Sequence, residues 1–410
     1  LQRAFDNGRL LDNDSVAYAS TSNATEELQL KATLQPARDF KIDLNASWVK
    51  TNARNIQFMY AGMPETRTGT FNMTTITIGS AFERRKASNG YHSERFADFV
   101  RSLETVQRRV QGQYSGAVYP EGTALAGMPF DPANGSVGKY SPDVMIPAFL
   151  ATYAGGDAST TSLGFFPSML SMLPNWRLTY SGLGKLEMFK KYFKSVNINH
   201  SYKSVYSVGS FNTYSTYMEY MNGLGFISDV TTGSPVPSSM FDISAVSINE
   251  QFSPLVGVDV TLLNNMTMKL QYNKSRVMNL SMSSVQLVET NSDDIVFGVG
   301  YKMTNVKLFG VGKRPTGGGR GRVSNDLNLR ADLSWRDQSA LCRNIQDITT
   351  QATSGNKALK ISLSADYTFS RMLTLNAYYD HQTNIPVVSA SSYPTSTHDF
   401  GVSLKFSLTR

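Results

Sequence analysis

Large apolar side chains occupy every second position in long stretches of this sequence. Between Asp294 and Thr304 the odd positions are Ile, Phe, Val, Tyr and Met, and most even positions are polar or glycine. The same alternation returns over 28–34, 40–48, 327–335, 359–369, 373–379 and 400–408. Because successive side chains of a β-strand point to opposite faces, this period of two predicts strands with one apolar and one polar face.

The composition narrows what such strands can form. Only 17% of the 410 residues are charged, against roughly 25% in an average soluble domain. The 22 Phe and 20 Tyr argue against disorder, and no run approaches the ~18 apolar residues of a transmembrane helix. We therefore predict an all-β fold, a transmembrane antiparallel β-barrel or an arc of a very large one, in a bacterial outer membrane.

Few residues are arranged for nucleic-acid binding, metal binding or catalysis. The 39 basic and 32 acidic residues leave a scattered charge of +7, so nucleic acid is not an expected partner. One cysteine, Cys342, and four dispersed histidines give no metal-ligand spacing. The neighbours Asp380/His381 and His398/Asp399 would point to opposite faces of a strand, so neither pair converges. We predict no catalytic residue, no cofactor site and no metal site.

Three short turns test whether the strands share one apolar face. The predicted opposite pairs are Leu34 with Phe40 across a 35–39 turn, Leu262 with Met266, and Phe369 with Leu373 across the 370–372 turn. All three preserve parity, and Asn265 is a plausible left-handed residue. A periplasmic C-terminus makes the 264 and 371 turns periplasmic and the 337–357 and 384–398 loops external. The 35–39 turn would then fall on the outer side, which leaves the parity before residue 175 open.

Strand parity assigns a face to each side chain of the C-terminal strands. The polar residues predicted to face the lumen are Asp294, Lys302, Arg330, Asp332, Arg336, Lys360, Asp366, Asp380 and Lys405. The residues predicted to face lipid are Phe297, Tyr301, Leu329, Leu333, Trp335, Leu363, Tyr367, Phe369, Leu404 and Phe406. Mixed charges could line a weakly selective channel, or could equally form ion pairs that brace a hydrated wall.

Three charged residues break the apolar face of a long hairpin centred on residue 264. Its arms have room for more than 20 residues each, and Glu250, Lys274 and Arg276 lie about a dozen residues from the turn. At ~3.3 Å per residue and a ~40° tilt, this is roughly 30 Å above the turn. We expect these charges at the water interface, with Tyr272 in an aromatic girdle.

The alternation stops between residues 83 and 174. Ser93 can cap a helix, and Ser141 with Pro142 begins a second, shorter one that ends near Gly155. A third amphipathic stretch, 186–193, fits a membrane surface or a turn packed beneath the barrel. We divide the chain into first strands (1–82), a partly helical insertion (83–174) on an undetermined side of the membrane, and the main strands (175–410). Leu1 is not an initiator Met, so we expect a piece of a longer chain.

Several idiosyncratic strings occur in an order that resembles a known family. Those strings are PNWRLTYSGLGKLEMFKKYFKSVNINHSYKSVYSVGSF (174–211), VSINEQFSPLVGVDVTLLNNMTMKLQYNKSR (246–276), SNDLNLRADLSWRD (324–337), TQATSGNKALKISLSADYTFSRMLTLNAYYD (350–380) and SPDVMIPAFLATYAGGD (141–157). They resemble the C-terminal part of the SprA/Sov family, the outer-membrane translocon of the type IX secretion system in Bacteroidota.

The resemblance implies one giant barrel whose pore passes folded proteins. It implies as partners the upstream part of the same long polypeptide, a PorV-type barrel, a plug protein, periplasmic accessory subunits, secreted cargo proteins and outer-membrane lipid. From the residues alone, twelve strands could also close as a self-contained porin or nutrient-uptake channel. An outer-membrane enzyme and a soluble β-sandwich are further alternatives.

Overall fold

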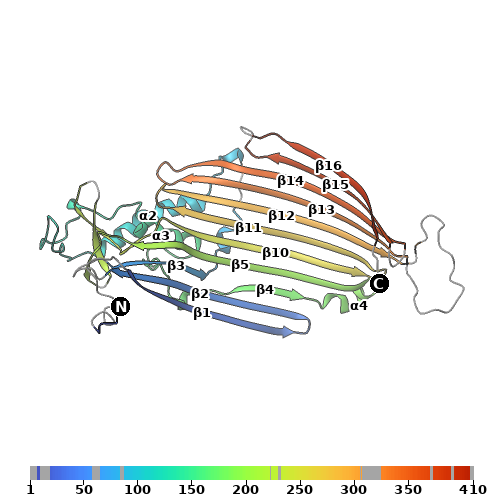
Figure 1. Cartoon of the computed structure of the whole chain (residues 1–410), viewed down its shortest axis with the longest axis horizontal. Coiled ribbons are helices and arrows are strands. Elements are labelled where there is room, and N and C mark those ends of the chain that lie inside the picture. The colour runs from blue at the N-terminus through green and yellow to red at the C-terminus, as the bar shows by residue number, and fades with distance from the viewer. Residues whose placement is uncertain are drawn as a thin grey trace.

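A computed structural model describes residues 7–9, 19–57, 65–83, 87–221, 223–229, 232–304, 306, 325–369, 373–388 and 392–406. Long antiparallel strands dominate it, and a smaller partly helical unit covers part of one side of the sheet (Figure 1). The predicted all-β antiparallel fold with a partly helical insertion is confirmed.

Thirteen of the described strands form one sheet, in the order β1-β2-β3-β5-β10-β11-β12-β13-β14-β15-β16, with β4 between β2 and β5 and β9 beside β5. Their bounds are β1 Ala19–Ala37, β2 Phe40–Gln57, β3 Thr66–Thr74, β4 Asn175–Tyr180, β5 Phe193–Thr213, β9 Phe241–Asp242, β10 Ala245–Leu262, β11 Met266–Ser281, β12 Gln286–Met303, β13 Leu327–Asn344, β14 Thr349–Thr368, β15 Leu373–Pro386 and β16 Thr395–Phe406. Within the described ranges β1 pairs only with β2, and β16 only with β15. The sheet is therefore open, with two edges.

Several strands extend further from the 264 turn than their alternation suggests. The predicted 337–357 loop is wrong, because β13 and β14 continue to a four-residue turn at 345–348. The predicted 384–398 loop is also shorter, since β15 reaches Pro386 and β16 begins at Thr395. By contrast, the arms of the hairpin centred on residue 264 are shorter than the more than 20 residues predicted, since β10 and β11 have 18 and 16 residues. The parts of β13, β14 and β15 far from the 264 turn are polar on both faces or covered by the insertion, so the apolar alternation fades there.

Two of the three predicted turns are confirmed. Phe369 donates its N–H to the Leu373 carbonyl at 3.0 Å, although residues 370–372 lie outside the described ranges. The register places Val260 opposite Met268, as a 263–265 turn requires, and Asn265 has a φ of 63°. Asparagine tolerates this left-handed conformation because its short polar side chain bonds locally.

The predicted 35–39 turn is too long, and the structure places it at the end of the sheet that the strand count had left open. A bulge brings Ala37 opposite Phe40, so only residues 38 and 39 turn, with Asp39 at a φ of 65°. Asp39 bonds Lys185 at 2.6 Å, and the same 181–192 connection accepts the Leu263 N–H through Tyr192. The β1–β2 hairpin therefore turns at the same end of the sheet as the β10–β11 hairpin (Figure 1). The even residues of β2 lie on the same face as the even residues of β10, so the predicted parity extends to the strands before residue 175.

The insertion interrupts a single strand position. β3 and β4 both lie between β2 and β5, with Met73 opposite Trp48 and Asn175 opposite Asn45. The chain thus leaves the sheet after Thr74 and re-enters it at Asn175 in the same strand position, further along β2. Such an arrangement attaches about a hundred residues to the thirteen-stranded sheet, which we call the wall, without adding a strand.

Two helices form the centre of the insertion. Helix α2 spans Glu94–Gly112 and α3 spans Pro142–Tyr153. The Ser93 side chain accepts the Phe96 N–H at 3.1 Å, which confirms the predicted cap. Phe99, Leu103 and Phe149 are fully buried in one core with sheet residues such as Ile248 and Met278. The insertion therefore packs on the face of the sheet that carries the even residues of β10 and β11.

Smaller elements complete the unit. A second sheet comprises β6 Met218–Met221, β7 Leu224–Ser228 and β8 Pro235–Ser238, and Tyr114 donates to the Gly225 carbonyl at 3.0 Å. The short helices are η1 Ile78–Ser80, η2 Ala87–Asn89, η3 Pro132–Asn134, η4 Met169–Ser171, η5 Leu183–Lys185 and α4 Glu187–Lys190. Of the amphipathic stretch at 186–193, only residues 187–190 are helical, and Met188 and Tyr192 are exposed.

Candidate functional site

The strand register separates the wall into two chemically different faces. Directly opposed residues of antiparallel strands share a face. Leu270, Phe297, Leu333 and Ile361 form one such cross-strand row, all apolar. The neighbouring row on the other face is Lys269, Gly298, Asp332 and Ser362. The alternation along each strand is thus matched across at least four strands.

The ten residues predicted to face lipid share the apolar face. Seven are exposed by 37–66%: Phe297, Leu329, Leu333, Trp335, Leu363, Leu404 and Phe406. Tyr301 and Phe369 are half-buried. Tyr367 departs from the prediction, since only 2% of it is exposed. Its hydroxyl donates to the Val306 carbonyl at 2.8 Å and its ring packs on Phe369, so neighbouring chain covers it.

The nine residues predicted to face the lumen share the opposite, polar face. Their cross-strand partners include Gly298 for Asp332, Gly300 for Arg330, Ser334 for Lys360, Ser362 for Asp380 and Thr374 for Lys405. A polar hollow of about 700 Å³ lies over this face, lined in part by Asp259, Lys269, Lys302, Arg330, Asp332 and Asp366. Gly298 helps to form it, because a Cβ there would lie 2.6 Å from an Asp332 carboxylate oxygen.

Charges on the polar face are paired loosely. Arg336 and Asp294 are 3.6 Å apart, Lys302 and Asp326 are 3.0 Å apart, and both basic side chains are more than half exposed. Exposed pairs of this kind contribute about 0–1 kcal/mol. The part of the polar face around these two pairs is consequently an exposed surface of mixed sign with few fixed contacts.

The charges that interrupt the apolar face lie where the insertion meets the wall. Lys274 bonds Asp293 on the next strand at 2.8 Å, and the Tyr272 hydroxyl donates to the same carboxylate at 2.8 Å. These residues line a cleft of about 690 Å³ between the wall and the insertion, beside Phe82 and Tyr91. The charged row therefore divides the face into a bare apolar part near the 264 turn and a covered part beyond it.

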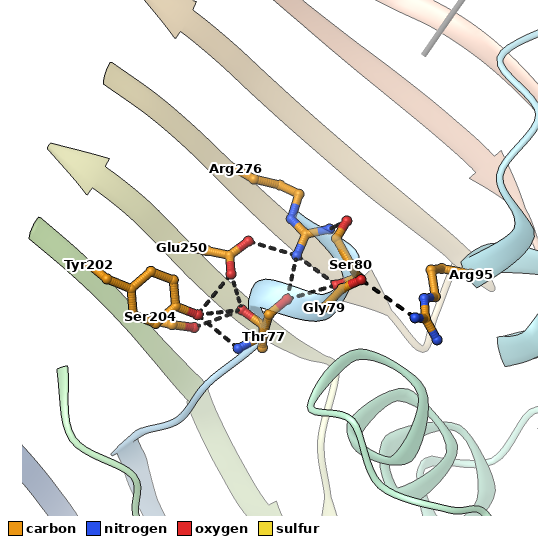
Figure 2. A network of polar contacts seen from close by, with 8 residues as sticks. All are labelled: Thr77, Gly79, Ser80, Arg95, Tyr202, Ser204, Glu250 and Arg276. Atoms are coloured by element: carbon orange, nitrogen blue, oxygen red, sulfur yellow. Dashed lines mark hydrogen bonds and ion pairs between the residues drawn. The ribbon is translucent and has the colours of Figure 1, made fainter. Parts of the chain in front are cut away.

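Glu250 and Arg276 are buried rather than placed at the water interface as predicted. They are 1% and 3% exposed, and Arg276 Nη2 lies 2.7 Å from Glu250 Oε2 (Figure 2). Glu250 Oε1 also accepts from Thr77 at 2.7 Å and from Tyr202 at 2.8 Å, while Arg276 donates to the Ser80 carbonyl at 2.7 Å. The stretch after β3 folds back over β10 and β11, a long-range contact that no local pattern indicates.

A second buried ion pair fastens the helical part of the insertion. Arg343 on β13 lies 3.0 Å from Glu289 on β12 and is 1% exposed. It donates to the Tyr91 carbonyl at 2.9 Å, and its guanidinium lies 5.6 Å from the centre of the Phe96 ring. Two arginine clusters thus bind backbone carbonyls of the insertion to the wall.

The carboxyl of Asp143, in helix α3, is also buried. It accepts the Ser239 backbone N–H at 3.2 Å and the Ser238 hydroxyl at 3.4 Å. Burial raises the pKa of this carboxyl above its ordinary value, and the bonds from Ser239 and Ser238 offset part of the increase. Asp143 joins α3 to the start of the 239–244 return to the wall.

Cross-strand pairing brings together histidines that the sequence analysis had considered only along the chain. His381 lies opposite His398, and their rings stack with centroids 4.3 Å apart. Asp380 and Asp399 are opposite one another on the polar face. The missed signal is the mirrored order Asp-His and His-Asp in two strands of one hairpin. Within the described ranges no three His, Cys, Asp or Glu residues group around a possible metal position.

No family model and no curated protein matches the chain. Among solved structures, the β domain of the Bordetella autotransporter BrkA is 8% identical over 95% of this chain and 92% of that one, with a TM-score of 0.25. OmpT, an outer membrane protein of Vibrio cholerae in its trimer form, is 10% identical over 96% and 99%, with a TM-score of 0.24. None of the helices in the described ranges has the length and apolarity to cross a bilayer.

Proposed function

We propose that this chain is an arc in the wall of a giant outer-membrane channel, the C-terminal part of a SprA/Sov-type translocon that exports folded proteins. The observation that carries the proposal is a sheet with one apolar and one polar face that is open at both edges. The bare apolar face meets lipid, and the polar face lines a hydrated pore.

The exposed apolar residues support the membrane location. Large contiguous apolar surfaces are rare on soluble proteins and mark contacts with lipid or protein. Here the exposed side chains recur on neighbouring strands, from Leu270 on β11 to Leu404 on β16. In lipid every backbone polar group needs an internal partner, a requirement that a continuous ladder of strands satisfies.

The open edges favour an arc over a self-contained porin. A porin closes when its first strand pairs with its last. Here thirteen strands pair in one sheet, yet β1 and β16 have one neighbour each in the described ranges. An unpaired edge within a bilayer is costly, so both edges require strands from elsewhere, in our proposal from the upstream part of the same polypeptide.

The channel acts passively. Its polar face offers water and mixed charges to hydrated cargo, which crosses without entering lipid. A PorV-type barrel, a plug protein and periplasmic subunits are the partners that the resemblance suggests for loading and sealing. We assign no catalytic step.

The mass and composition of the native detergent-solubilised complex test this proposal. We expect one particle far larger than the 45.2 kDa of this chain, in which this sequence is covalently continuous with upstream strands. A monomer of about that mass which conducts ions in planar bilayers would establish the porin alternative instead.

A further inference from the structure

The insertion joins the wall through two short connections. One runs from the end of β3 through residues 75–83, and the other runs through residues 167–174 to the start of β4. We call these two segments the stalks. Both lie on the same side of the sheet, because the first stalk meets Glu250 and the second meets Trp48, whose side chains share one face beside the border between its bare and covered parts.

The stalks carry most of the exposed apolar side chains of the insertion. In the described part of residues 75–174, six large hydrophobic residues are exposed, and four of them are in the stalks. These are Ile78 (37%), Phe82 (52%), Leu170 (97%) and Leu173 (42%). The other two, Val118 and Met128, lie on the 118–129 hairpin.

The first stalk reaches the edge of the bare apolar face. The Phe82 ring lies 5.4 Å from the ring of Phe252, and Lys274 Nζ is 6.0 Å from the centre of the Phe82 ring. Between these residues and the 264 turn, the apolar face carries the exposed side chains of Val256, Leu270 and Ile295. Phe82 therefore continues the apolar surface of the wall on to the insertion.

Both stalks are held firmly. Trp48 Nε1 donates to the Pro167 carbonyl at 2.8 Å, and the Leu173 N–H donates to the Thr74 carbonyl at 3.1 Å. Arg276 binds Ser80 in the first stalk (Figure 2). Anchored backbones keep the apolar side chains exposed at a fixed height on the wall.

We propose that the stalks rest on the surface of the outer membrane, with Phe82 and Leu170 inserted among the lipids at the level of the headgroups. The inference rests on the proposed function, because it requires the bare face to be surrounded by lipid. Lipid is the occupant that the geometry favours, since the stalk residues continue a surface already assigned to lipid and lie beside the charged row where it ends. The insertion would then be a brace that sets the height of the wall in the bilayer.

Spin labels on the intact protein in vesicles of palmitoyl-oleoyl phosphatidylcholine test this. The change Cys342→Ser is made first, and Leu170→Cys, Phe82→Cys, Leu363→Cys on the bare face and Met128→Cys on the insertion are then each introduced singly. Collision with oxygen, which concentrates in lipid, is compared with collision with a water-soluble nickel chelate. We expect Leu363 to report deep lipid, Leu170 and Phe82 a shallow depth with an oxygen-to-nickel ratio several-fold above that of Met128, and Met128 water.

The outcomes separate the two proposals. If Leu170 and Phe82 match Met128 while Leu363 reports lipid, the stalk inference is wrong and the wall stands. If Leu363 also matches Met128, the membrane wall itself is wrong. Low collision with both reagents at Leu170 would mean that a protein surface covers it, which also overturns the inference.

Discussion

Glu250 and Arg276 satisfy one another across neighbouring strands while both also bind the first stalk. Removing one member of such a buried pair leaves the other charge buried without a partner, which lowers the free energy of unfolding by about 3–5 kcal/mol. Replacing both members with apolar residues is often nearly neutral. We expect Glu250→Ala to lower the free energy of unfolding by that amount and the double change Glu250→Leu with Arg276→Met to lower it much less. Urea unfolding in detergent, followed by tryptophan fluorescence, measures both, and equal losses would contradict a coupled pair.

Asp143 makes the stability of the insertion depend on pH. Its pKa is raised in the folded protein, so the ionised carboxylate is disfavoured there. The stabilising effect of the neutral form is present below the unfolded pKa of about 4 and is lost as the pH rises through the folded pKa. Asp143→Asn keeps an acceptor for the Ser239 N–H without the charge, so we expect a higher melting temperature than wild type at pH 7 and an equal one at pH 3.

The same site offers a contrasting variant. Asp143→Ala leaves the Ser239 N–H without its acceptor, which costs about 1–3 kcal/mol when the group is buried. That loss should appear at pH 3 and at pH 7. Resistance of the 83–174 region to limited proteolysis at the two pH values reports it, and an Asn variant no more stable than wild type at pH 7 would argue against a strained carboxylate.

Among the elements, the β10–β11 hairpin depends on one left-handed residue. Asn265 has a φ of 63°, where a β-branched side chain costs about 1–2 kcal/mol more and glycine costs nothing. We expect Asn265→Gly to fold as well as wild type and Asn265→Val to be destabilised by about that amount. The rate of assembly into detergent micelles, read by the heat-modifiable shift on gels, distinguishes them, and equal behaviour would mean that the turn adopts another conformation.

Strand elements were predictable where one face is apolar and the other polar, as in residues 294–303. They were predicted too short where that contrast disappears, as in β13 beyond Trp335, whose end bears Arg343 and Leu341 under the insertion. The cap at Ser93 and the turn at Asn265 were predictable because each depends on residues within three positions of it. The 35–39 turn was not, because a bulge between Leu34 and Ala37 shifts the register beside the loop, from Leu34 opposite Ile42 to Ala37 opposite Phe40.

For the whole molecule, the polar face should conduct ions with little preference for charge. The nine residues assigned to the lumen comprise five basic and four acidic side chains, a balance of 5 − 4 = +1. A wide pore with so small a net charge exerts a weak field on the ions within it. We expect a potassium-to-chloride permeability ratio close to 1 for the complete channel, measured from reversal potentials in a salt gradient. A ratio of ten or more in either direction would show that other segments line the pore.

The pattern of residues was enough to predict most of the strands, the parity of their faces after residue 175 and the two principal helices, because each of these arises from neighbours a few positions apart. It left open which charges are buried and where the insertion lies. Thr77 meets Glu250 across 173 positions, and Arg343 meets Tyr91 across 252. Such contacts depend on the tertiary arrangement of distant segments. The alternation along a strand does not indicate which other segment will cover it.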